Sequence, residues 1–180
     1  MGSPKEPRPV KLFAALLLNS EDLLGSVEED LIELFGSVDS SSRLLSWGLS
    51  EYYAKEMGTE LLRRFISFGP LISPERLPET KLQTQTLERK YQWVRGEEEG
   101  RRVNIDPGYV DAGKVVLAST KSAGHRIYLR AGIYAEATLL YHDGSFQPFV
   151  YTYKDYLWAE TISFFSALRS RYLSQLRRDN

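Results

Sequence analysis

Hydrophobic and polar positions alternate most regularly between residues 101 and 141, in a pattern that is typical of strands. Val103 and Ile105 alternate with polar neighbours, which is the two-residue period of a half-buried strand. Residues 106–108 (Asp-Pro-Gly) are turn formers, so we expect them to end this strand. Further strands are predicted over residues 114–118, 126–130 and 133–141, with a loop over 119–124.

The two strands that flank Ala131-Gly132 predict their own register. A three-residue loop over 130–132 pairs Leu129 with Ile133, and Ile127 with Ala135, so that the apolar residues share one face. The same register sets Tyr128 opposite Tyr134 and Arg126 opposite Glu136 on the other face. That ion pair is either a surface pair worth under about 1 kcal/mol or a charged floor for a ligand.

The first half of the chain alternates strand and helix patterns. An almost entirely apolar run over 10–18 predicts a strand covered on both faces. A helix from Asn19 or Ser20 to Phe35 follows, and then a loop over 37–42, a strand over 43–49, a helical turn over 51–58 and a strand over 61–68. Ser73-Pro74 is expected to open a second helix, with Leu87, Tyr91 and Val94 on its inner face. A solvated loop is predicted over 96–100.

Together with the strand at 103–105, this gives the order strand, helix, strand, strand, helix, strand. That is the split βαβ order of a ferredoxin-like sheet. An antiparallel meander over 114–150 extends it, and Asp155 is expected to cap a final helix that runs through Leu176. The sequence therefore predicts one α+β domain over 10–180, preceded by a flexible, proline-rich arm over 1–9.

Composition narrows the range of functions. The 180 residues carry a net charge of −1, which gives no strong signal for nucleic-acid binding. The chain has no cysteine and two histidines, which argues against thiolate metal sites and a histidine-based zinc site. No apolar run reaches the roughly 18 residues of a membrane span, so we expect a cytoplasmic protein. The composition identifies no cofactor and no oligomeric state.

Polar residues of the central stretch form a candidate site. We predict that His125, Asp106 and Glu136 transfer protons, because an imidazole and two carboxylates can act as acid and base near neutral pH. The residues predicted to bind an anionic ligand are Arg64, Asn104, Tyr109, Lys121, Arg126 and Tyr128. The alternative interpretation is a loop histidine beside a solvated hairpin.

Three other features have two interpretations each. Residues 108–114 (GYVDAGK) match the core of a phosphate-binding loop, but Val115 and a strand follow where Ser or Thr and a helix are required. Arg63-Arg64 lies on an apolar strand, and a buried arginine there needs a partner such as Asp106 or Glu56. The aromatic residues between 151 and 158 are either core or a stacking surface for a ligand.

Several segments together resemble a bacterial family known as domain of unknown function 4416. They are PVKLF (9–13), EYYAKEMG (51–58), RRFISF (63–68), RRVNIDPGYV (101–110), VLASTK (116–121), HRIYL (125–129), GIYAEATL (132–139) and TYKDY (152–156). The family has no established activity, and some members carry a GTP-binding label. The chain differs from the family pattern at residues 47–49 and at Lys154, while the proposed acid–base, Lys121 and Arg126 positions match it.

These observations favour a small-molecule binding domain or enzyme for an anionic, phosphate- or nucleotide-like ligand. The alternative is a noncatalytic module whose hairpin face docks a protein. GTP binding is disfavoured because the phosphate-loop context is incomplete.

Overall fold

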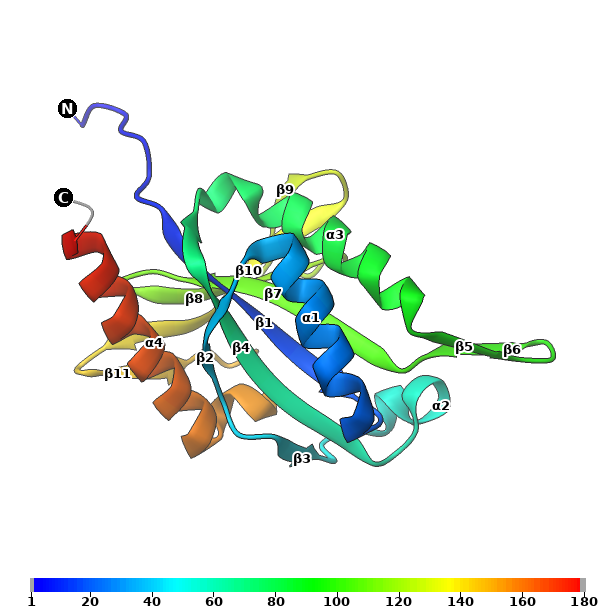
Figure 1. Cartoon of the computed structure of the whole chain (residues 1–180). Coiled ribbons are helices and arrows are strands. Elements are labelled where there is room, and N and C mark those ends of the chain that lie inside the picture. The colour runs from blue at the N-terminus through cyan, green and yellow to red at the C-terminus, as the bar shows by residue number, and fades with distance from the viewer. Residues whose placement is uncertain (1, 179–180) are drawn as a thin grey trace.

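The computed structural model describes residues 2–178 and confirms an α+β fold built on a mainly antiparallel sheet (Figure 1). The main sheet has the order β11-β10-β8-β7-β1-β4-β2, with β3 added beside β4 and β9 beside β10. Its strands are β1 (Val10–Leu18), β2 (Val38–Ser41), β3 (Leu45–Trp47), β4 (Leu61–Ile72), β7 (Val103–Val110), β8 (Lys114–Ser119), β9 (Ile127–Arg130), β10 (Ile133–His142) and β11 (Ser145–Pro148).

Four α-helices accompany the sheet in the described part of the chain. They are α1 (Leu24–Phe35), α2 (Ala54–Met57), α3 (Leu77–Lys90) and α4 (Ala159–Arg178). Short 3₁₀ helices cover Glu21–Leu23, Glu51–Tyr53, Pro74–Arg76 and Lys154–Leu157. Helices α1 and α3 lie on one face of the sheet and α4 lies on the other (Figure 1). No helix in residues 2–178 is long and apolar enough to cross a membrane.

Strand β1 lies at the centre of the fold, as its apolar sequence predicts. All nine of its residues are buried, because β4 and β7 flank it and helices cover both faces. Its even-numbered residues from Leu12 to Leu18 pack against α1 and α3, whereas Phe13 and Ala15 pack against α4. The alternation follows from the two-residue period of a strand.

Several predicted turns and loops are in fact strands. Strand β7 does not end at residues 106–108 but continues through them to Val110. Proline is tolerated there because β8 pairs only with Gly108–Val110, so β7 lacks a second neighbour at Pro107. Gly108 is required by close packing, since a Cβ would lie 2.3 Å from the Val116 carbonyl oxygen.

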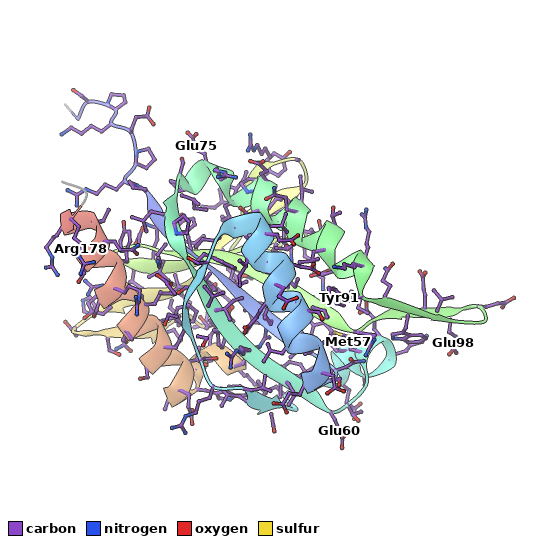
Figure 2. All side chains as sticks on the ribbon, viewed as in Figure 1. Met57, Glu60, Glu75, Tyr91, Glu98 and Arg178 are labelled. Carbon is purple, nitrogen blue, oxygen red and sulfur yellow. The ribbon has the colours of Figure 1, made fainter. Side chains whose placement is uncertain are left out.

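The predicted loops over 37–42 and 96–100 also contain strands. Residues 38–41 form β2 at the edge of the sheet. Strands β5 (Gln92–Arg95) and β6 (Glu98–Arg101) form a separate hairpin that projects from the body, and Val94 is exposed there instead of lining a helix. Figure 2 shows Tyr91 where α3 ends and Glu98 on the projecting hairpin.

The β9–β10 hairpin differs from its prediction in the turn and in the face that is buried. Ala131 and Gly132 both have positive φ and form a two-residue turn, so Arg130, not Leu129, lies opposite Ile133. A bulge then restores the predicted Tyr128–Tyr134 and Ile127–Ala135 pairs. Ile127 is 72% exposed, so the apolar face of β9 is open to solvent while Glu136 is buried.

Candidate functional site

A charged cleft of about 450 Å³ opens where β7 and β8 separate. The two strands pair only between Gly108–Val110 and Val115–Leu117. Before Gly108, β7 pairs with β1 alone, and after Leu117, β8 pairs with β10 alone. The gap in the sheet exposes the polar side chains of both strands to one space.

Helix α3 satisfies the free edge of β7 with two charged side chains. The Ile105 N–H donates to Glu88 Oε1 at 2.7 Å, and Lys81 Nζ donates to the Ile105 carbonyl oxygen at 2.9 Å. Lys81 also lies 3.1 Å from Asp106 Oδ1. Because a buried backbone group without a partner is costly, these side chains take the place of the missing strand.

The environment shifts the pKa values of the two carboxyl groups in opposite directions. Burial raises the pKa of Glu88 above its usual value, although Lys81 opposes the shift. Burial would also raise the pKa of Asp106, but the charges of Lys81 and Arg63 outweigh it and hold that pKa below its usual range. Asp106 is therefore a carboxylate at neutral pH, with its side chain one-third exposed.

The strand register sets the charged residues in adjacent rows on the α4 face. Arg63 on β4 and Asn104 on β7 lie on either side of Leu17. In the next row Asp106 lies beside Ala15, whose short side chain leaves space above the sheet. Asn104 connects the rows, since its Nδ2 donates to Asp106 Oδ2 at 2.8 Å.

One wall of the cleft is formed by an ion pair between β10 and the loop before β9. Arg126 Nε lies 2.8 Å from Glu136 Oε2, as the hairpin register predicts, and both side chains are buried. The other guanidinium nitrogens of Arg126 donate to the Lys121 carbonyl oxygen and to the Tyr153 hydroxyl. Each guanidinium nitrogen of Arg126 therefore donates a hydrogen bond within the protein.

The floor of the cleft contains buried donors with no hydrogen-bond partner in residues 2–178. Arg63 is 5% exposed, and its Nη2 lies 2.7 Å from Asp155 Oδ2, but its Nε and Nη1 have no partner. The indole N–H of Trp47 and the hydroxyl of Tyr156 are likewise buried and unpaired. Each such group costs about 1–3 kcal/mol, so a cluster of them at one cleft requires an explanation.

Burial also affects the phenol of Tyr156. It raises the pKa of this hydroxyl well above the usual value, so the group is a neutral donor at physiological pH. The Tyr156 ring packs against Phe165 and Phe65 in the core. The hydroxyl is therefore held by rigid packing at the boundary between the core and the cleft.

A family model described as Domain of unknown function (DUF4416) matches residues 8–172. The chain belongs to this family. No curated protein and no solved structure gives a significant match. Of the segments that carry the family resemblance, all but PVKLF contribute at least one residue to the cleft.

The structure brings most of the predicted site residues of this family member together. Those that line the cleft are Asn104, Asp106, Lys121, Arg126 and Glu136. His125 lies behind the wall, where its Nε2 is 3.1 Å from Glu136 Oε2 and its ring stacks on Tyr151. His125 does not line the cleft itself, but it contacts Glu136, which does.

Three predicted ligand-binding residues lie elsewhere. Arg64 is on the opposite face of β4, where it pairs with Glu28 of α1. Tyr109 lines a separate hollow beside Lys114. Tyr128 is exposed on β9.

The site contains residues that the sequence alone did not single out as ligand-binding. They include Trp47, Lys81, Glu88 and Asp155, whereas Arg63 was considered only together with Arg64, and Tyr156 only as one of the aromatic residues between 151 and 158. Arg63 could have been identified from strand alternation, because Arg64 shares the face of Leu62 and Ile66 and so leaves Arg63 on the other. Asp155 was expected to cap a helix, but it lies in a 3₁₀ turn and pairs with Arg63 instead.

The segment GYVDAGK (108–114) covers the end of β7, a tight turn over 111–113 and the first residue of β8. Asp111 Oδ1 accepts hydrogen bonds from the backbone N–H groups of Gly113 and Lys114, and Asp111 Oδ2 pairs with the Lys114 ammonium. A phosphate loop needs free N–H groups that lead into a helix, whereas strand β8 follows here.

A second hollow, of about 540 Å³, lies beside α2 and Trp93, and Glu56 in its lining pairs with Arg101 of the main cleft. In the described part of the chain, no group of three or more His, Asp or Glu side chains is arranged to hold a metal ion.

Proposed function

We propose that the cleft binds an anionic small molecule, whose oxyanion accepts hydrogen bonds from the floor. The unpaired N–H groups of Arg63 carry this proposal, together with the Trp47 N–H and the Tyr156 hydroxyl. All three residues line the cleft. Hydrogen bonds in which one partner is charged are the strong ones, so an anion is the best-matched acceptor for a guanidinium.

The size of the cleft supports a small-molecule ligand. Its volume of about 450 Å³ falls within the range of about 300–1,000 Å³ that is usual for such sites. Its lining also includes the hydroxyl side chains of Ser119, Thr120 and Tyr53 beside the charged groups. A ligand with several polar substituents fits this lining better than an apolar one.

Asp106 is the best placed of the residues predicted to transfer a proton. Its carboxylate is partly exposed, and it accepts one hydrogen bond on each oxygen, from Lys81 and from Asn104. A carboxylate can accept about four hydrogen bonds, so Asp106 keeps acceptor sites for a ligand. Glu136, by contrast, is 1% exposed.

One observation favours the alternative of a protein-interaction module. On β9, Ile127 is 72% exposed and Tyr128 is 57% exposed, and large apolar side chains of this kind occur at interaction surfaces. The cleft contains several buried polar groups without hydrogen-bond partners, and we therefore prefer the small-molecule proposal.

We also propose that the core of the sheet is ferredoxin-like. The spatial order β7-β1-β4-β2 and the packing of α1 and α3 on one face support this arrangement. The β8–β11 meander would then be an addition that creates the cleft, because the cleft lies at its junction with β7.

The test is a thermal-shift screen with carboxylates, sugar phosphates, nucleotides and inorganic phosphate. We expect at least one anion to raise the Tm of the wild type, and Arg63→Lys to remove most of that shift because an ammonium does not reproduce the Nε and Nη1 donors of the guanidinium. The matched control is Arg64→Lys, the neighbouring arginine on the opposite face, which should keep the full shift. The absence of a shift with every anion, or equal loss in both variants, would contradict the proposal.

A further inference from the structure

The charges around Arg63 indicate which kind of anion the cleft takes. Resting on the proposed function above, we infer that the ligand presents a single carboxylate to Arg63, and not a phosphoryl group. Two observations carry this inference: the pairing of the cleft cations and the net charge of the lining.

The unpaired donors at the floor can receive the oxygens of an anion. The free atoms are Nε and Nη1 of Arg63, which carry three N–H bonds, the indole nitrogen of Trp47 and the hydroxyl of Tyr156. Nε and Nη1 lie on opposite edges of the guanidinium, so they form no fork for one carboxylate, and five donors also suffice for the three oxygens of a phosphoryl group. The charges of the cleft therefore decide between the two kinds of anion.

Four of the five cations that line the cleft have carboxylate partners. Arg63 contacts Asp155 at 2.7 Å, and Arg126 contacts Glu136 at 2.8 Å. Lys81 contacts Asp106 at 3.1 Å. A site that binds a doubly charged phosphoryl group usually offers cations that are not neutralised in this way, because the buried charge must be compensated.

The net charge of the lining is suited to one negative charge. Five cationic side chains and four anionic ones line the cleft, which leaves one positive charge in excess. Glu56, the outer partner of Arg101, is 38% exposed and lies outside the lining. A monoanion neutralises this excess, whereas a dianion leaves an uncompensated negative charge in a buried site.

Nuclear magnetic resonance of the tryptophan indole groups tests the inference directly. The probes are benzamide, benzoate and phenyl phosphate, which share a ring and carry charges of zero, −1 and about −2 near neutral pH. The indole N–H signal of Trp47 reports on the floor, and Trp47→Phe assigns it. The Trp93 indole, which donates to the Glu56 carbonyl oxygen, is the internal control.

We expect benzoate to shift the Trp47 signal with a Kd at least about tenfold lower than benzamide or phenyl phosphate, while the Trp93 signal stays in place. Phenyl phosphate should bind more tightly as the pH falls through its second pKa of about 6, since it then becomes a monoanion. Equal or tighter binding of phenyl phosphate near neutral pH would overturn the carboxylate inference and leave the anion site intact. Equal binding of benzamide, or no Trp47 shift with any probe, would also overturn it, and the thermal-shift screen then decides separately on the proposed function.

Discussion

Two ends of the same sheet face have opposite chemistry. Under α4, Phe13 and Phe65 pack against Phe165, with ring centroids 4.9 and 5.4 Å from it. Two residues further along β4, Arg63 is equally buried but has two N–H groups without a partner. The first end is fully packed and apolar, and the second is polar and incompletely paired.

The difference arises from the coverage of the sheet. Helix α4 lies over the Phe13 row, where β7 and β8 are still paired through Gly108 and Leu117. Beyond that row β7 and β8 separate. Glu88 of α3 then accepts a hydrogen bond from the free edge of β7, and Asp155, in the segment before α4, pairs with Arg63 of β4. One region packs apolar side chains closely, and the other leaves buried donors without partners, which is the contrast on which the proposed function rests.

The largest effect is expected at the packed end. Phe165→Ala should lower the free energy of unfolding by about 3–5 kcal/mol, because it opens a cavity among five aromatic rings. Urea denaturation measures the loss. Leu157→Ala, at a side chain that is 48% exposed, is the control and should cost far less. Equal losses would mean that the α4 contact is not the main apolar core of this face.

A nearly equal effect is expected from breaking the ion pair at the polar end. Arg63→Met leaves Asp155 buried without its cation and should cost about 3–5 kcal/mol. The double variant Arg63→Met/Asp155→Leu removes both charges and should recover most of that loss in the same denaturation assay. If the double variant is as unstable as the single one, the pair is not an isolated buried contact.

A smaller effect is expected in the pH dependence of stability. The pKa of Asp106 is lowered in the folded state, so its contribution is complete above the unfolded value of about 3.9 and is lost as the pH falls towards the folded pKa. Asp106→Asn should therefore have a lower free energy of unfolding than the wild type near neutral pH. The difference between the two proteins should narrow below about pH 4. Asp143→Asn, at a side chain 83% exposed, should show no such gap.

The smallest effect is expected at Arg64. Its ion pair with Glu28 is partly exposed on both sides, so Arg64→Met should change the free energy of unfolding by less than about 1 kcal/mol. Comparison with Arg63→Met in one denaturation series contrasts adjacent residues on opposite faces. A loss at Arg64 as large as that at Arg63 would remove the distinction between the two faces.

Much of the fold follows from local sequence patterns. The uniform apolar run of β1 and the alternation around Val103 identified buried strands, and the α+β class followed from them. The errors occurred where tertiary contacts decide the outcome. Asp-Pro-Gly favours a turn locally, but pairing with β1 extends β7 through it, and a weakly apolar segment such as 38–41 becomes a strand only because β4 offers an edge.

The candidate site was predictable only in part. Arg126 and Glu136 were identified because they are neighbours on one hairpin, where register can be inferred from sequence. Arg63 and Asp155 are 92 positions apart, and nothing local connects them. The gap between β7 and β8 likewise depends on where two strands separate, which the sequence pattern does not encode.

The most direct test of the central claim is the stability of Tyr156→Phe with and without benzoate. The buried hydroxyl is unpaired, so its removal should raise the free energy of unfolding of the ligand-free protein by about 1 kcal/mol. It should also reduce the stabilisation that saturating benzoate gives to the wild type, so the two stability curves should cross as benzoate is added. A ligand-free variant that is less stable than the wild type, with an unchanged response to benzoate, would contradict the view that these donors are kept for a ligand.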